Sequence, residues 1–282
     1  MFQRFSNSWS LVKASAAVLG ADKELMVFPA ISAVLSVVVL ITFAVPSVLA
    51  GLFDSTVLAD SGLPLAGYVV GFLFYVVQYF VIIFCNTALV GAALIRLRGG
   101  DPTVGDGFRL ATSRVGHILG YAVIAATVGV ILRAISERSG VIGKLVVSLV
   151  GLAWNLATFL VVPVLAAEDV GPMDAVKRSS AYLRKTWGEQ IVGTAGMGAV
   201  FGLISFGTVI LFIALFIAAA ATQSAAVMIA VAVGFGLTML ALVLVSSTLG
   251  GVYAAAVYRY AAEGDAGTFF SADLVRGAFE RK

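Results

Sequence analysis

Residues 190–258 read QIVGTAGMGAVFGLISFGTVILFIALFIAAAATQSAAVMIAVAVGFGLTMLALVLVSSTLGGVYAAAVY, and this stretch contains no charged residue. A helix needs roughly 20 residues to cross the ~30 Å hydrocarbon core of a bilayer, so the stretch is too long for a single crossing. Its aliphatic sequence is interrupted at Thr222, Gln223 and Ser224. We therefore expect two membrane-spanning helices with a turn between them.

Four other charge-free runs lie upstream, at residues 25–53, 61–95, 115–132 and 145–167. Each is long enough for one crossing, which gives six spans in total. The apolar residues run continuously instead of alternating, so helices are favoured over the strands of a membrane β-barrel. The sequence therefore predicts an all-α, polytopic membrane protein in a single domain of residues 1–282.

The overall composition supports this interpretation. The chain is 61% hydrophobic and 12% charged, with a mean hydropathy of +1.06. Soluble domains have roughly 25% charged residues, so a soluble fold is excluded. The first run is longer than the core of a signal peptide, and we expect it to stay attached. Cys85 is the only cysteine, so an intrachain disulfide is impossible.

The basic residues divide unequally between the two sides of the predicted membrane. Only Arg133, Arg138 and Lys144 fall on one side, and the other fifteen of the 18 Lys and Arg residues fall on the other. Loops rich in Lys and Arg face the cytoplasm. The sequence therefore predicts a multi-pass protein of the cell membrane with both termini in the cytoplasm.

The chain shows signs of a threefold repeat. Each predicted helical hairpin ends in a short small-or-acidic element, followed by an amphipathic stretch; the elements are Gly99-Gly100-Asp101, Ala167-Glu168-Asp169 and Glu263-Gly264-Asp265. We interpret the unit as one cytoplasmic interfacial helix followed by one transmembrane hairpin. The approximate units are residues 1–98, 99–167 and 168–263, with an amphipathic tail at 264–282.

Three of the amphipathic stretches have one apolar face each. The faces consist of Phe5, Trp9, Val12, Ala16 and Leu19; of Val104, Phe108, Ala111, Val115 and Ile118; and of Met173, Val176, Leu183 and Trp187. Basic residues occupy the other faces, where each Lys or Arg contributes about 1 kcal/mol toward binding anionic lipid. The same helices would also serve as a structural collar under the bundle, and both roles stay open.

Three segments carry a resemblance to a known family. They are SWSLVKAS at residues 8–15, DKELMVFP at 22–29 and VPVLAAEDVGPMDAVKRS at 162–179. They resemble a prokaryotic six-span membrane family of unknown function, the DUF6159 family, which is distantly similar to the membrane domain attached to some glycerophosphodiester phosphodiesterases. The resemblance implies the fold and the helix count. It implies no activity and no catalytic residue.

The sequence offers little for catalysis. A metal site needs several converging ligands, and the chain has a single histidine, His117, besides its single cysteine. Nor does it contain a glycine-rich phosphate-binding loop. We therefore expect no catalytic residue, no metal, no cofactor, no nucleic-acid partner and no enzymatic activity.

Glu168 and Asp169 form the most informative acidic pair because they follow an apolar run directly. Carboxylates near a bilayer are usually paired, so we expect ion pairs with Lys177, with Arg178, or with basic residues of other repeats. A structural role is favoured over ion or proton coupling, which usually requires a site near the middle of the membrane.

Other polar candidates lie within the spans and at their ends. The amides of Gln78, Asn86 and Asn155 either bond to neighbouring helices or line a small polar cavity. The basic candidates for contact with lipid or a partner are Lys177, Arg178, Arg184 and Lys185.

Two functions remain from this reasoning. The first is a non-catalytic protein that organises or senses at the inner leaflet, with anionic lipids and a membrane or cytoplasmic protein as partners. The alternative is a small transporter or channel for a lipid-like or apolar solute. It is less favoured because the repeats share one orientation, and because Pro46 and Pro163 lie near span ends, which predicts unbroken helices. The sequence is compatible with a homo-oligomer.

Overall fold

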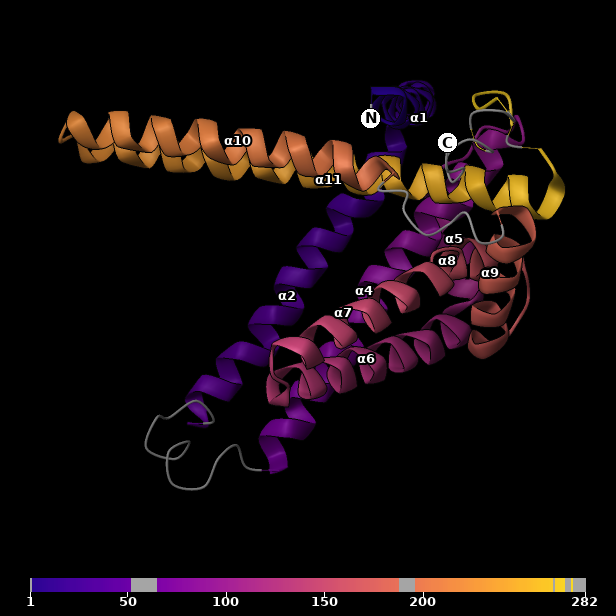
Figure 1. Cartoon of the computed structure of the whole chain (residues 1–282), viewed down its shortest axis with the longest axis horizontal. Coiled ribbons are helices and arrows are strands. Elements are labelled where there is room, and N and C mark those ends of the chain that lie inside the picture. The colour runs from indigo at the N-terminus through magenta and orange to yellow at the C-terminus, as the bar shows by residue number, and fades with distance from the viewer. Residues whose placement is uncertain (1, 52–64, 188–195, 266, 272–274, 276–282) are drawn as a thin grey trace. The chain divides into compact units, whose positions relative to one another are not determined.

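The computed structural model describes residues 2–51, 65–187, 196–265, 267–271 and 275. These residues are helical apart from short turns, and they include no strand, which confirms the all-α prediction. Figure 1 labels the elements. They are α1 (Phe2–Ala21), the 3₁₀ helix η1 (Lys23–Met26), α2 (Val27–Leu49), α4 (Leu65–Leu97), α5 (Val104–Ser113), α6 (Val115–Arg138), α7 (Val141–Ala157), α8 (Val161–Ala167), α9 (Pro172–Trp187), α10 (Gly196–Ala221) and α11 (Ala225–Glu263).

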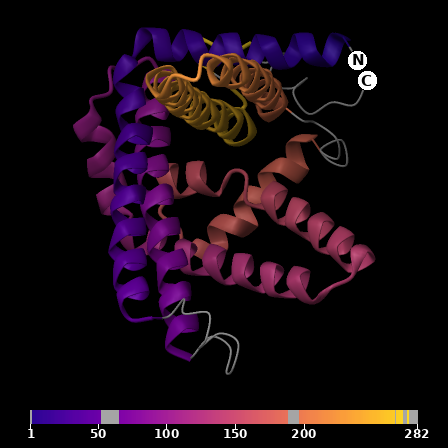
Figure 2. The ribbon, with the colours of Figure 1, turned by 90° about the vertical axis from the view of Figure 1, so that its left-hand side faces the viewer.

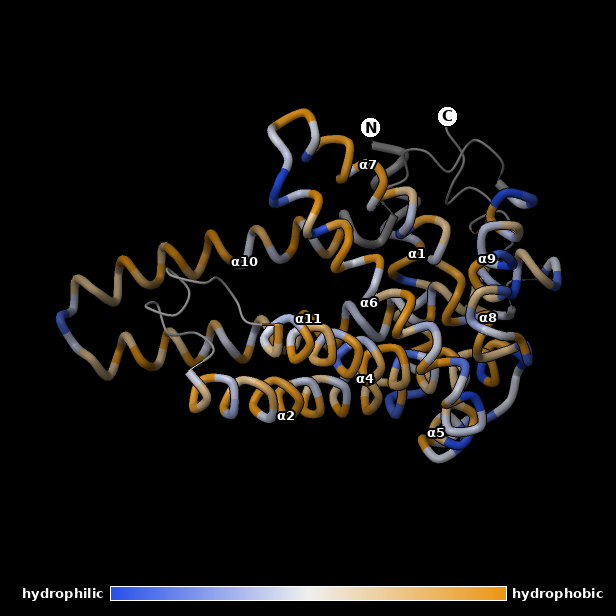
Figure 3. Tube along the Cα trace, turned by 90° about the horizontal axis from the view of Figure 1, so that it is seen from below, coloured by the Kyte–Doolittle hydropathy of each residue, from blue (hydrophilic) through white to orange (hydrophobic). Residues whose placement is uncertain are grey.

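The described residues contain six helical segments that are long and apolar enough to cross a membrane, as predicted. They are Lys23–Leu49, Leu65–Leu97, Val115–Arg138, Val141–Ala167, Val200–Ala221 and Ala225–Glu263. Figure 3 shows that hydrophobic residues predominate along α10 and along the part of α11 that lies beside it. The predicted turn between them is present, and Gln223 adopts a positive φ of 50° there. The chain therefore fits a multi-pass membrane protein.

The chain divides into two compact units. Unit 1 comprises Met1–Met26, Ala93–Asp101 and Arg184–Lys282, and unit 2 comprises Val27–Ala92 and Pro102–Leu183. In unit 1, α10 and α11 pack side by side and both contact α1. In unit 2, α6 packs on α7, and α2 meets α4 through Phe43 and Phe74, whose ring centroids are 5.7 Å apart.

Helices α4 and α11 are unusually long, and each is buried at its C-terminal end. They contain 33 and 39 residues, or about 50 and 58 Å of helix. Burial is continuous over residues 87–94 of α4, whereas in α11 every buried residue lies between Thr248 and Tyr258. Because about 30 Å of each helix is enough to cross a bilayer, the last turns need cover from protein.

The fourth span is interrupted, contrary to the prediction of unbroken helices. Helix α7 ends at Ala157 and α8 begins at Val161. Pro163 explains the break, because its ring would clash with the carbonyl of Phe159 in a continuous helix. In the observed structure this proline lies in the first turn of α8, where its missing N–H costs little.

Helix α5 begins with a capping box and packs closely against α4. The Thr103 side chain accepts a hydrogen bond from the Asp106 amide at 3.2 Å, and the Asp106 carboxylate accepts one from the Thr103 amide at 3.0 Å. The hydrogen bonds from Thr103 lower the pKa of Asp106. Phe108 packs on Phe28 and Phe84, with ring centroids 5.2 and 6.1 Å away. The capping box therefore fixes the start of a helix that is packed on one side.

The apolar faces predicted for α5 and α9 are only partly the faces that become buried. Near α5, Ala111 and Ile118 are buried, but Val115 is 45% exposed. The periodicity assumed one helix through this region, whereas α5 ends at Ser113 and α6 begins at Val115, which displaces the later positions. Met173 of α9 is also exposed. The side chain of Trp187 and most of the predicted tail at 264–282 lie outside the described residues.

The buried face of α9 is formed largely by small residues. Ala175 and Ser179 are fully buried, and Leu183 is nearly so. Small side chains let helices approach closely, so close packing rather than hydrophobicity selects this face. In α1, Val12 of the predicted apolar face is buried, whereas Trp9 and Ala16 are exposed. Phe5 has no described side chain.

Gly107 gives a direct test of the α5 packing. A Cβ at this position would lie 2.5 Å from Phe28 Cζ and 2.7 Å from the Ala88 carbonyl oxygen. We expect Gly107→Ala to lower the free energy of unfolding by about 1–3 kcal/mol because the site has no room. Thermal unfolding in detergent measures the loss.

The matched control is Gly105→Ala in the same helix. Its Cβ would meet only Thr103 Oγ1, at 3.6 Å. Alanine favours a helix over glycine by roughly 0.5–1 kcal/mol, so this variant should be unchanged or slightly stabilised. Equal melting temperatures for the two variants would contradict the close packing of α5.

Candidate functional site

A group of charged and polar residues in unit 2 lies around the turn that follows α8. We call this group the acidic-turn cluster, and it contains Arg114, His117, Glu168, Asp169, Arg178 and Tyr182. Glu168 ends α8 with an extended backbone conformation, at φ −119° and ψ 144°. Two consecutive carboxylates thus follow the helix at the point where the chain turns toward α9.

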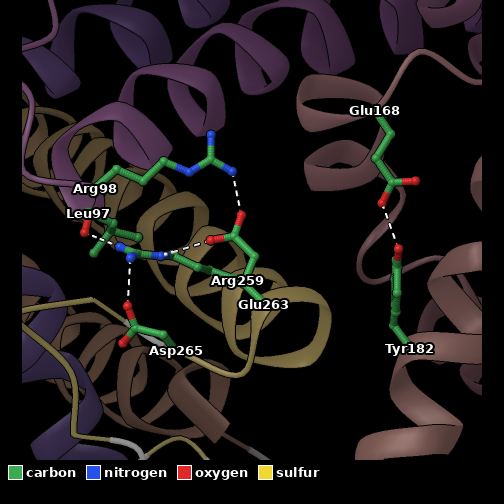
Figure 4. Close-up of polar contacts among 7 residues, drawn as sticks. All are labelled: Leu97, Arg98, Glu168, Tyr182, Arg259, Glu263 and Asp265. Carbon is green, nitrogen blue, oxygen red and sulfur yellow. Dashed lines mark hydrogen bonds and ion pairs between the residues drawn. The ribbon is translucent and has the colours of Figure 1, made fainter.

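Glu168 is the most buried charged residue of this cluster. Its side chain is 14% exposed and forms an ion pair with Arg178. It also accepts a hydrogen bond of 2.8 Å from the Tyr182 hydroxyl (Figure 4). Burial and the adjacent carboxylate raise the pKa of Tyr182, and the hydrogen bond to Glu168 raises the pKa of Arg178. The Tyr182 hydroxyl therefore stays neutral and keeps the proton that it donates to Glu168.

Asp169 connects the acidic turn to the start of α6. It forms an ion pair with Arg114, and its Oδ1 lies 3.8 Å from His117 Nδ1. Arg114 belongs to a different predicted repeat from Asp169, so this contact is one of the anticipated pairs between repeats. Lys177 instead pairs with Asp174, at 3.2 Å, so the expected pair with Glu168 is made by Arg178 alone.

Helix α9 holds both ends of α8. The buried Ser179 hydroxyl accepts a 3.0 Å hydrogen bond from the Leu160 amide at the start of α8, while Arg178 pairs with Glu168 at its end. The side chains of Val161, Val164 and Leu165 on α8 are fully buried. Polar contacts from α9 thus stabilise both ends of α8, and the contact with Leu160 lies at the break in the fourth span.

Unit 1 has its own charged group, the arginine cluster of Arg98, Arg259, Glu263 and Asp265 (Figure 4). Arg259 pairs with Asp265 at 2.6 Å and with Glu263 at 3.2 Å, and Glu263 also pairs with Arg98. Arg259 donates a further hydrogen bond to the carbonyl of Leu97 at the end of α4. These contacts join the ends of α4 and α11.

Glycines with left-handed backbone conformations shape the two helix ends that meet here. Gly264 has φ 77° and follows α11, and Gly99 has φ 86° and follows α4. Glycine adopts this conformation without steric cost, and it commonly ends helices. The chain therefore turns directly after each helix, which brings Asp265 back beside Arg259.

A second arginine, Arg96, ties α4 to the start of η1. It pairs with Asp22 at 3.1 Å and also with Asp101. The Asp22 side chain is only 6% exposed, so this carboxylate depends on its partner. The sequence marks Asp101 and Asp265 as parts of the repeat elements, but it does not predict the ion pairs that involve Asp22, Arg98 or Glu263. The sequence pattern that could have indicated these ion pairs is the acidic residue that recurs after each long helix.

Among the described residues, no hydrogen bond joins the polar amide side chains of the spans. Asn155 is exposed and Asn86 is half-buried, and neither makes a hydrogen bond within the described residues. The side-chain carbonyl oxygen of Gln78 is buried without a hydrogen-bond partner. The described residues also contain no group of three or more His, Cys, Asp or Glu side chains suited to a metal ion. The site is thus a set of charge-compensated contacts at helix ends.

Comparison with known proteins places these helices in a family. The model of a family of unknown function, DUF6159, matches residues 65–269, which is more than half of the chain. The protein belongs to this family. The resembling segment 162–179 lies inside the match, whereas 8–15 and 22–29 precede it. No curated protein and no solved structure matches the chain, so the comparisons add nothing on the likeness to the phosphodiesterase membrane domain.

Ser179 tests the contact that stabilises the break in the fourth span. Ser179→Ala leaves the buried Leu160 amide unpaired, and we expect a loss of about 1–3 kcal/mol in the free energy of unfolding. Ser180→Ala is the control, because Ser180 is exposed and bonds only to Lys177 of its own helix. Thermal unfolding of both variants measures the difference. Equal melting temperatures would show that the contact between Ser179 and Leu160 does not contribute to stability.

Glu168 tests the acidic-turn cluster. Glu168→Gln preserves the shape but removes the charge that faces Arg178, and we expect a loss of about 1.5–3 kcal/mol together with faster hydrogen exchange in α9. The control is Asp174→Asn, which removes an exposed ion pair with Lys177 worth about 0–1 kcal/mol. A control effect as large as that of Glu168→Gln would show that burial of Glu168 does not matter.

Proposed function

We propose that this DUF6159 protein is a non-catalytic membrane protein that organises or senses at the inner leaflet of the cell membrane, with both termini in the cytoplasm. The observation that carries the proposal is the division of its cations into two groups. Six arginines on the predicted cytoplasmic side pair with acids: Arg96, Arg98, Arg109, Arg114, Arg178 and Arg259.

The second group consists of exposed cations on the same predicted side. Lys13, Lys23, Arg184 and Lys185 are exposed and make no ion pair within the described residues. Apart from Arg109, which pairs within α5, the paired arginines hold helix ends together. The four unpaired cations leave their charge available to an anionic surface. Each unpaired cation near anionic lipid contributes about 1 kcal/mol. These four residues favour an inner-leaflet role.

The division into paired and unpaired cations reduces the set of basic residues predicted to contact lipid or a partner. Lys177 and Arg178 already have acidic partners, so Arg184 and Lys185 remain as the unpaired cations of α9. The amphipathic character of α5 and α9 then supports the collar role for their paired residues and a lipid-contact role for the end of α9. Anionic lipid is the proposed partner, and a cytoplasmic protein with an acidic surface would use the same residues.

One observation favours the alternative, a small transporter or channel for a lipid-like or apolar solute. The interruption between α7 and α8 produces a discontinuous span, and such spans line the binding sites of many transporters. Asn86 and Asn155 do not converge on this break through any hydrogen bond. The inner-leaflet role is therefore the better supported of the two.

Lipid retention tests the proposal. The protein is reconstituted in nanodiscs of equal parts phosphatidylglycerol and phosphatidylcholine, released in the mass spectrometer, and its bound lipids are counted. We expect phosphatidylglycerol to be retained preferentially. The double variant Arg184→Glu, Lys185→Glu should reduce that preference by roughly tenfold or more, because it reverses two unpaired charges.

The matched control removes a charge pair from the same helix. Lys177→Gln with Asp174→Asn leaves the net charge of α9 unchanged, so lipid retention should also be unchanged. Retention that shows no preference for the anionic lipid in the parent protein would overturn the proposal. Solute flux in proteoliposomes that is lost in Asn86→Ala would support transport instead.

A further inference from the structure

Helix α1 has two distinct faces. Leu11 and Val18 are at most 1% exposed and Ser15 is fully buried, which defines one face. Trp9 is 43% exposed, and Lys13, Ala16, Ala17 and Gly20 are exposed as well. We call Trp9, Lys13, Ala16 and Gly20 the outer face of α1. Because residues in an α-helix advance by about 100° each, these four lie on the side opposite Leu11, Ser15 and Val18.

The buried face of α1 accounts for its contacts with protein. Within unit 1, α1 packs against both α10 and α11. Figure 2 shows α1 running across these two helices, which are seen almost end-on. The outer face is therefore turned away from them. It includes Trp9 and Ala16 of the predicted apolar row, whereas Val12 of the same row is buried. Trp9 and Ala16 are thus exposed among the described residues of unit 1.

The position of α1 along α11 corresponds to a membrane surface. Residues 225–247 of α11 include no buried residue, whereas burial begins at Thr248. The unburied segment is about 34 Å long, which matches the hydrocarbon core of a bilayer. In Figure 1, α1 crosses at the end of the α10–α11 pair that is far from the 222–224 turn. A helix that crosses spanning helices at this level lies along the membrane surface.

The positive charge of α1 favours an anionic partner. Lys13 Nζ lies 6.0 Å from the centre of the Trp9 ring, and residues 2–21 contain no acidic residue. The next acid, Asp22, is buried and paired with Arg96. Tryptophan and lysine together are typical of the membrane–water interface, where the ring lies at headgroup level and the ammonium reaches phosphate groups.

We propose that the outer face of α1 docks on the anionic lipid surface of the inner leaflet, with Trp9 at headgroup level and Lys13 against lipid phosphates. This inference rests on the proposed function and names α1 as its lipid contact. The exposed small residues Ala16 and Gly20 let the helix lie close to the lipid surface. A second copy fits less well, because its α1 offers no acid to Lys13.

Tryptophan fluorescence tests the proposal in the full chain. The chain has three tryptophans, and Trp154→Phe with Trp187→Phe leaves Trp9 as the only emitter; the variant's melting temperature must match that of the parent. The protein is reconstituted in vesicles of equal parts phosphatidylglycerol and phosphatidylcholine, with or without lipids brominated near the headgroup end of the acyl chain. We expect brominated lipid to quench Trp9 strongly and aqueous acrylamide to quench it weakly.

Charge reversal provides the second arm. In the single-tryptophan background, Lys13→Glu should reduce quenching by brominated lipid by about half or more, because it replaces attraction to the lipid phosphates with repulsion. Lys144→Glu is the matched control. It reverses an exposed cation on the predicted opposite side of the membrane and should leave Trp9 quenching unchanged.

Two results would overturn the proposal. Strong acrylamide quenching with no effect of brominated lipid would place Trp9 in water. Quenching that depends on the protein-to-lipid ratio but is the same with and without brominated lipid would assign the outer face of α1 to contact with a second copy of the chain. Because lipid retention through Arg184 and Lys185 is measured separately, its success together with failure of the Trp9 test would leave the inner-leaflet role intact and remove only the α1 contact.

Discussion

The length of α4 and α11 is the constraint on which the rest of the structure depends. A bilayer accommodates about 30 Å of apolar helix, and both helices exceed this by several turns. The excess turns satisfy their own backbone groups, but their apolar side chains still need cover. In unit 2 this cover includes α5, whose Gly107 lies against the Ala88 carbonyl of α4. In unit 1 it includes α1, which packs on α11.

Ion pairs follow from the same constraint. Where helix ends are covered by protein, charged side chains near them lose water and need a partner of opposite charge. Arginine suits this role because its guanidinium binds several acceptors at once. Arg259 shows the pattern, since it contacts two carboxylates and the Leu97 carbonyl. The partly buried Glu168 shows the reverse, with one arginine and one tyrosine as partners.

The sequence was sufficient for features set by composition along the chain. Charge-free runs located six spans, and polar residues at 222–224 located a turn, because solvation by lipid or water decides both. It was insufficient where packing decides. Periodicity placed Met173 and Trp9 on apolar faces, but it did not indicate that Ser179 and Ser15 are the residues buried in these helices, where small side chains allow close approach.

In the candidate site, ion pairs between residues close in the chain could be predicted, whereas pairs between distant segments could not. The pair of Glu168 with Arg178 was among those expected from the sequence, since the residues are close in the chain. The pair of Asp22 with Arg96 was not, because it joins segments far apart in the chain. Pro163 did indicate a break, because its ring clashes with the carbonyl of residue 159 in a continuous helix. Its position near the end of the span nevertheless led to the prediction of an unbroken helix. The threefold repeat stays a prediction.

The attachment of α8 to α9 has a mechanical consequence. Hydrogen bonding at the first turn of α8 and ion pairing at its end both come from consecutive residues of α9, Ser179 and Arg178. Helix α8 is therefore held by α9 at both of its ends, and residues 158–160 form the turn between α7 and α8. A displacement of α9 would carry α8 with it and would change the angle between α8 and α7 at this turn.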